Sequence, residues 1–82
     1  MIQGKLYRWA GDQNTFLWSP KDDSSVGFVN TGDFLLFLSS ERFAYGEDQV
    51  ETEGFLVIHE DQVGSIFLTN VNVDDFFKEA TE

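Results

Sequence analysis

The chain has 82 residues, of which 15 are acidic and 5 are basic, so it carries a net charge of −10 at pH 7. A chain of this length builds one domain around one core. The lack of cysteine excludes a disulfide scaffold and a thiolate zinc site, and the charge opposes direct binding to nucleic acid. With 41% hydrophobic residues and 9 phenylalanines, the chain is too apolar to be disordered.

The first part of the chain reads as short strands separated by turns. Residues 5–9 are strand-like and place Tyr7 and Trp9 on one face. A turn cluster rich in Gly, Asp and Asn follows, and residues 15–18 form a second β-rich run. Residues 20–25 are polar and are expected to be a surface loop.

The middle of the chain contains the clearest strand and a hairpin. Residues 34–38 are apolar on both faces, which predicts burial on both sides or at an interface. Residues 55–58 and 63–68 are strand-like and are separated by the turn 60–62, which predicts a hairpin. The apolar runs are far shorter than the about 20 residues of a membrane helix, and no secretory leader is visible. We therefore expect a cytoplasmic protein that does not enter a membrane.

The end of the chain has a helical pattern. Asn72 suits an N-cap, and Asp75 lies three positions on, as in a capping box. The apolar residues of this segment recur at helical spacing, and they are Val73, Phe76, Phe77 and Ala80. The pattern predicts a short helix over about residues 73–80 that docks on the sheet.

Together these elements predict a single, mostly β domain over residues 1–82, a small barrel of five or six short strands with one short C-terminal helix. Three segments carry a resemblance: the aromatic strand 5–9, Gly32-Asp33 followed by the strand 34–38, and residues 63–67 followed by the helix. In these respects the chain resembles an SH3-like β-barrel. It lacks the paired Trp of signalling SH3 domains and its helix is longer, so the resemblance does not imply binding of Pro-rich peptides.

A second resemblance rests on the start Gly4-Lys5-Leu6-Tyr7-Arg8, the Gly32-Asp33-apolar strand and the terminal segment Asp75-Phe76-Phe77. In these features the chain is similar to small accessory proteins of tailed bacteriophages. The resemblance implies a phage-encoded protein that acts in the host cytoplasm and binds a host or phage protein.

The sequence contains no recognisable catalytic constellation. The single histidine, His59, lies at a strand end, where a structural or surface role is the ordinary expectation. No nucleophile elbow, phosphate-binding Gly-rich loop or calcium-binding loop is present. We therefore expect a protein that is not an enzyme, with no catalytic residues, cofactor or metal. A pocket that holds His59 with two carboxylates would reopen the enzyme hypothesis.

The negative charge is concentrated in the second half of the chain. Residues 1–43 hold 5 acids and 4 bases, whereas residues 44–82 hold 10 acids and one base. The candidate acidic patch consists of Glu47, Asp48, Glu51, Glu53, Glu60 and Asp61. Solubility explains such charge in many proteins, and the alternative is an electrostatic field that steers a partner with a basic surface.

Aromatic residues near strand ends form a candidate docking patch. Its members are Tyr7, Arg8, Trp9, Trp18 and Tyr45, and these residue types dominate interface hot spots. Alternatively, Trp9 and Trp18 pair across the first hairpin and close one end of the barrel. The remaining strand and helix phenylalanines are expected in the core, and they are Phe16, Phe34, Phe37, Phe55, Phe67, Phe76 and Phe77.

Two functions are compatible with these features. The first is a small non-catalytic module that binds a protein partner through aromatic side chains and a sheet edge. The second is an acidic inhibitor that mimics nucleic acid and blocks the cleft of a basic DNA- or RNA-binding protein. A homodimer is compatible with the two-faced strand 34–38.

Overall fold

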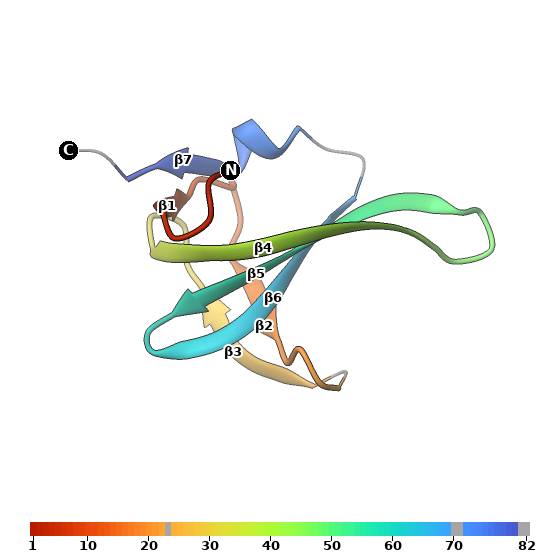
Figure 1. Cartoon of the computed structure of the whole chain (residues 1–82), viewed down its shortest axis with the longest axis horizontal. Helices are drawn as coiled ribbons and strands as arrows, with labels where there is room; N and C mark the ends of the chain where they lie inside the picture. The colour runs from red at the N-terminus through yellow and green to blue at the C-terminus, as the bar shows by residue number, and fades with distance from the viewer. Residues whose placement is uncertain (23, 70–71, 81–82) are drawn as a thin grey trace.

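The structure, a computed structural model, describes residues 1–22, 24–69 and 72–80. Within these residues, seven antiparallel strands form one sheet in the order β3-β2-β6-β5-β4-β1-β7. Figure 1 shows that the sheet curls into a half-barrel. The strands are β1 (Leu6–Trp9), β2 (Thr15–Trp18), β3 (Ser25–Val29), β4 (Phe34–Tyr45), β5 (Val50–His59), β6 (Gln62–Thr69) and β7 (Phe77–Glu79), with the 3-10 turn η1 (Val73–Asp75) before β7. The mostly β prediction is confirmed, although the described residues hold more strands than expected.

Strands β4, β5 and β6 form the long central meander. The predicted hairpin is confirmed, because Ile58 of β5 pairs with Val63 of β6 and His59 pairs with Gln62. Strand β5 begins well before the predicted residues 55–58, because Val50–Glu53 also pair with β4 as far as Tyr45. The far ends of β4 and β5 therefore project beyond the rest of the sheet (Figure 1), along a long axis of 42 Å.

The two-residue turn between β5 and β6 has an unusual backbone. Glu60 has φ 51° and Asp61 has φ 66°, and positive φ at both central residues is the signature of type I′ hairpin turns. Asn-Gly or Asp-Gly is the usual occupant of such turns, so the chain places two non-glycine residues where glycine is easier to accommodate.

Replacing Asp61 by glycine is expected to stabilise the protein by about 1 kcal/mol, because glycine adopts positive φ without the steric penalty of a side chain. For a domain of this size, about 1 kcal/mol raises the melting temperature by about 4–8 °C. Gly32 has φ 98°, so Gly32→Ala is the converse control and should lower the melting temperature. A lower melting temperature for Asp61→Gly would contradict the assigned turn.

The concave side of the half-barrel holds the core. Among the residues whose side chains the structure describes, ten hydrophobic ones are buried there: Tyr7, Trp9, Leu17, Val29, Leu35, Phe37, Phe55, Val57, Ile66 and Phe77. The ring of Trp9 packs against Phe77 and Phe76, with centroids 5.3 and 5.6 Å apart, and its Nε1 donates a hydrogen bond of 2.9 Å to the Gln13 carbonyl. Trp9 is thus a core residue whose one polar atom is satisfied.

Several predicted core positions face the solvent instead. Phe16, Phe34 and Phe67 are about half exposed, because each alternates along its strand with a buried neighbour. The segment 34–38 was expected to be buried on both faces, and only part of it is. Leu35 and Phe37 are buried and Leu36 is half-buried, whereas Phe34 is 56% exposed.

One close contact lets the sheet curl. Strand β2 pairs with β6 only at Trp18 and Ser65, and the fully buried Leu17 next to Trp18 lies directly against Gly64 of β6. A Cβ atom at position 64 would be 2.3 Å from Leu17 Cγ. The missing side chain therefore allows β2 to fold over β6 and bring Leu17 into the core.

The prediction of a C-terminal helix over residues 73–80 is wrong. Asn72 does cap a turn, with its side chain accepting a hydrogen bond from the Asp74 amide, but the turn is a single 3-10 turn. Phe77 then starts β7, pairs with Trp9 and is buried. The open edge of β1 offers backbone hydrogen bonds to this segment, and burial of Phe77 accompanies strand pairing there.

No helix in the described part of the chain has the length and apolar character needed to cross a membrane.

Candidate functional site

The convex side of the sheet carries an exposed aromatic cluster on β2 and β3. Phe16 and Trp18 flank the buried Leu17, so strand alternation places both rings on the convex side. The Phe16 ring lies 5.7 Å from that of Trp18 and 5.2 Å from that of Phe28, which is its cross-strand neighbour. Phe16 is 50% exposed and Phe28 is similarly exposed, so the cluster presents a continuous apolar surface.

A second aromatic pair lies on β4 and β6. The rings of Phe43 and Phe67 meet edge to face at 6.1 Å across Gly54 of β5, where a Cβ would lie 2.9 Å from the Phe67 ring. The glycine lets Phe67 lie close to the sheet. Phe67 is nevertheless 46% exposed, so this pair also faces outward.

A groove of about 760 Å³ lies between the two aromatic groups. Trp18 borders it on one side, Phe43 and Phe67 on the other. Its floor includes a cross-strand row of small and apolar side chains, Ser39, Leu56 and Ser65, in register on β4, β5 and β6. We call this groove with its aromatic borders the outer groove. Its shape follows from small floor residues between large border residues.

The rim of the outer groove is polar and charged. Lys21, Asp22 and Glu41 line it. The hydroxyl and then the amide of Ser24 donate hydrogen bonds to Asp22, and they hold the pKa of this carboxyl below its usual value. Asp22 therefore stays negatively charged at the rim even in mildly acidic solution.

The structure separates the predicted docking patch. Tyr7 and Trp9 are only 4% and 3% exposed, so their rings cannot meet a partner, and including them in the patch is wrong. Trp9 and Trp18 do not form a stacked pair either, since Trp18 packs on Phe16. Trp18 borders the outer groove and Arg8 is exposed on β1, whereas the side chain of Tyr45 lies outside the described residues.

The candidate acidic patch is also divided. Glu47, Asp48, Glu51 and Glu53 lie at the projecting end of the β4–β5 hairpin. The Oε1 atom of Glu53 lies 3.5 Å from Arg42 Nε and forms an ion pair with it. Glu60 and Asp61 form the turn at the opposite end of β5 (Figure 1). A ten-residue strand is about 33 Å long, so the two groups do not act as one surface.

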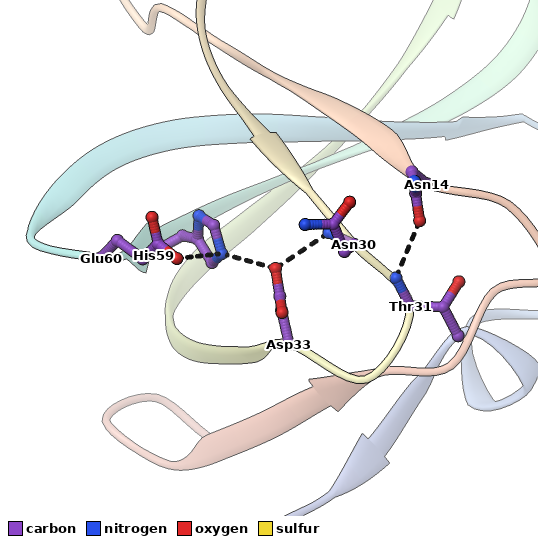
Figure 2. Close-up of polar contacts among 6 residues, drawn as sticks. All are labelled: Asn14, Asn30, Thr31, Asp33, His59 and Glu60. Atoms are coloured by element: carbon purple, nitrogen blue, oxygen red, sulfur yellow. Dashed lines mark hydrogen bonds and ion pairs between the residues drawn. The ribbon is translucent and has the colours of Figure 1, made fainter.

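A separate polar cluster surrounds the single histidine. His59 is buried at the end of β5, and its Nε2 lies 3.0 Å from Asp33 Oδ2 and 3.9 Å from Glu60 Oε2. Figure 2 shows Asp33 between the imidazole and the backbone amide of Asn30, which donates a 2.9 Å hydrogen bond to the same oxygen. Asp33 thus ties the β3–β4 turn to the end of β5. The structure thus brings His59 together with two carboxylates, as the enzyme hypothesis requires, but none of the three residues lines the outer groove.

Asp33→Ala is expected to lower the free energy of unfolding by about 1–3 kcal/mol, because the variant leaves both His59 Nε2 and the Asn30 amide without their acceptor. Asp33→Asn keeps an acceptor oxygen at that position and should lose less than half as much. Urea denaturation of both variants measures the difference. Equal losses would mean that the shared oxygen does not hold the two turns together.

Comparison with known proteins found no match to this chain among family models, curated proteins or solved structures. The resemblances to SH3-like barrels and to phage accessory proteins therefore stay predictions.

Proposed function

We propose that the protein is a non-catalytic interaction module that binds a protein partner through the outer groove. The observation that carries this proposal is the exposure of aromatic rings on both sides of the groove, with Phe16 and Phe28 extending one border and Phe67 forming the other. Large aromatic side chains gain binding energy when a partner buries them, and they dominate interface hot spots.

The size of the apolar surface supports this role. An aromatic side chain buries about 150–250 Å² in total, so the three rings that are about half exposed, those of Phe16, Phe28 and Phe67, still offer about 200–400 Å² to a partner. Exposed apolar patches of about 300–600 Å² on monomeric proteins are often functional. The groove floor adds hydroxyl groups from Ser39 and Ser65, which can hydrogen-bond to a bound polypeptide.

The charge of the chain favours a basic partner over a second copy. Each molecule carries −10, so two copies repel each other on approach, whereas a positively charged partner is attracted and associates faster. We therefore assign the groove to a different protein with a basic surface and do not assign it to a homodimer.

The nucleic-acid mimic stays an untested alternative. It requires carboxylates displayed side by side, but the six residues of the candidate acidic patch fall into two groups at opposite ends of β5. A mimic binds mainly through charge, so its affinity should fall steeply with salt. Binding through the outer groove should retain most of its affinity at 0.5 M salt.

The experiment is affinity capture from cells that encode the protein, followed by mass spectrometry. Wild type is compared with a groove variant, Trp18→Ser with Phe67→Ser, and with the control Phe34→Ser. Phe34 is 56% exposed but does not line the groove. We expect a partner that wild type and the control retain and that the groove variant loses. Retention by all three proteins would overturn the assignment of the groove.

A further inference from the structure

We propose that Asp33, His59 and Glu60 form a binding site for a divalent transition-metal ion of the zinc class. These residues offer one imidazole nitrogen and two carboxylate oxygens, and the three donor atoms lie within 4.8 Å of one another. Figure 2 shows both carboxylates directed at the same imidazole nitrogen. The proposal is independent of the outer groove, which none of the three residues lines.

The donor spacing fits one ion. Two donors that each lie about 2.1 Å from a metal are about 3.0–3.4 Å apart at octahedral to tetrahedral angles. His59 Nε2 and Asp33 Oδ2 already lie 3.0 Å apart. Glu60 Oε2 is 3.9 Å from His59 Nε2, and its side chain is 82% exposed, so a small rotation in solvent completes the set.

The surroundings orient the donors as metal sites require. His59 is held in the core by β5, so its ring has little freedom. The Asn30 amide fixes the Asp33 carboxylate through a hydrogen bond, as the outer-shell partners of metal ligands do. Glu60 follows His59 directly, and its Oε2 lies 3.9 Å from the ring nitrogen. Two ligands are therefore preorganised, and the third is adjustable.

The charge balance at the cluster also favours a cation. Among the described residues, Asp33 and Glu60 form ion pairs with no Lys or Arg, and their one basic neighbour is His59, which is charged only when protonated. A divalent ion supplies the missing positive charge. On binding, the ion takes the place of any proton on His59 Nε2, this proton passes to solvent, and the imidazole coordinates in its neutral form.

The donor set selects the class of metal. Imidazole suits zinc, copper, iron and nickel, whereas calcium takes six to eight oxygen ligands and magnesium prefers oxygen in octahedral geometry. Three protein ligands leave coordination positions for water. With one ligand on an exposed side chain, the site is expected to bind zinc with micromolar affinity.

The test is a zinc titration of the untagged protein followed by NMR. The chain has a single histidine, so the imidazole C–H signals report directly on His59. We expect these signals to shift and to saturate at one zinc per chain, while magnesium at the same concentration leaves them in place. Zinc that shifts only amides of the acidic hairpin end around Glu47 and Asp48 would overturn the proposal.

Matched variants distinguish coordination of zinc by Glu60 from electrostatic attraction of zinc to nearby carboxylates. Glu60→Gln and Asp61→Asn each remove one carboxylate from the same turn, but only Glu60 belongs to the cluster. We expect Glu60→Gln to weaken zinc binding about 10-fold and Asp61→Asn to change it less than about 2-fold. Asp33→Asn, with its fold verified by circular dichroism, should weaken binding at least as much as Glu60→Gln. Equal effects of Glu60→Gln and Asp61→Asn would show that charge alone attracts the ion, and would overturn the site.

Discussion

Gly64→Ala is expected to destabilise the protein by about 3 kcal/mol or more, which is a large share of the about 4–12 kcal/mol typical of a chain of this length. The new methyl group would lie 2.3 Å from Leu17 Cγ and 2.9 Å from both of its Cδ atoms. Leu17 is fully buried and cannot move aside without displacing the core. Strand β2 must therefore separate from β6, and urea denaturation should show a much lower midpoint.

A matched control isolates this contact. A Cβ at Gly27 would also face Leu17, but at 3.6 and 3.7 Å, which is an ordinary contact distance. Gly27→Ala should therefore change stability by less than about 1 kcal/mol. Combining Gly64→Ala with Leu17→Ala should cost less than the sum of the single changes, because the smaller side chain makes room for the methyl group. Similar losses for Gly27→Ala and Gly64→Ala would contradict the packing of β2 on β6.

Trp18→Ala is expected to weaken binding of the captured partner by about 10–100-fold, the range of an interface hot spot. The same change should alter the free energy of unfolding by less than about 1 kcal/mol, because Trp18 packs on the convex side and outside the core. Affinity is measured by calorimetry with the purified partner, and stability by thermal unfolding.

Trp9→Ala and Phe34→Ala serve as the two controls for this prediction. Trp9 is buried against Phe76 and Phe77, so its truncation should cost about 3–5 kcal/mol of stability. Phe34→Ala removes a ring that is exposed away from the groove and should change neither property strongly. A Trp18→Ala protein that binds normally would exclude the outer groove as the docking surface.

Local patterns in the sequence predicted β1, β2, the start of β4 and the β5–β6 hairpin, but not β7 or the long extensions of β4 and β5. Alternation at Tyr7 and Trp9 correctly predicted that both share a face, yet it could not show which face is buried. The answer depends on β7, because Phe77 and Phe76 cover Trp9 from a segment almost 70 residues away. The docking patch was therefore assigned to the wrong side of the first strand.

The C-terminal segment shows how tertiary pairing overrides local periodicity. Val73, Phe76, Phe77 and Ala80 fit a helical stripe, but Phe76 and Phe77 reach the core equally well from a turn and a short strand. The open edge of β1 favours the strand, because β7 pairs with β1 there and its backbone groups form hydrogen bonds. A single sequence does not reveal which edge is open.

The sequence predicted only some residues of the outer groove and did not predict the Asp33–His59–Glu60 cluster. Trp18 was predicted as a docking residue, but Phe16 and Phe67 were assigned to the core, because a strand with large residues on both faces has no preferred orientation. His59 and Asp33 are 26 residues apart, and only the meeting of two turns brings them together. No local spacing motif could have found that pair.

Amide hydrogen exchange of the protein with and without its captured partner tests the role of the outer groove most directly. We expect slower exchange in the partner complex for peptides that cover residues 18–22, 39–43 and 65–67, which border the groove, and no change around Leu6 and Arg8 on β1. Protection confined to the acidic hairpin end and to the Glu60–Asp61 turn, with the groove unprotected, would contradict the proposal and favour an electrostatic mimic.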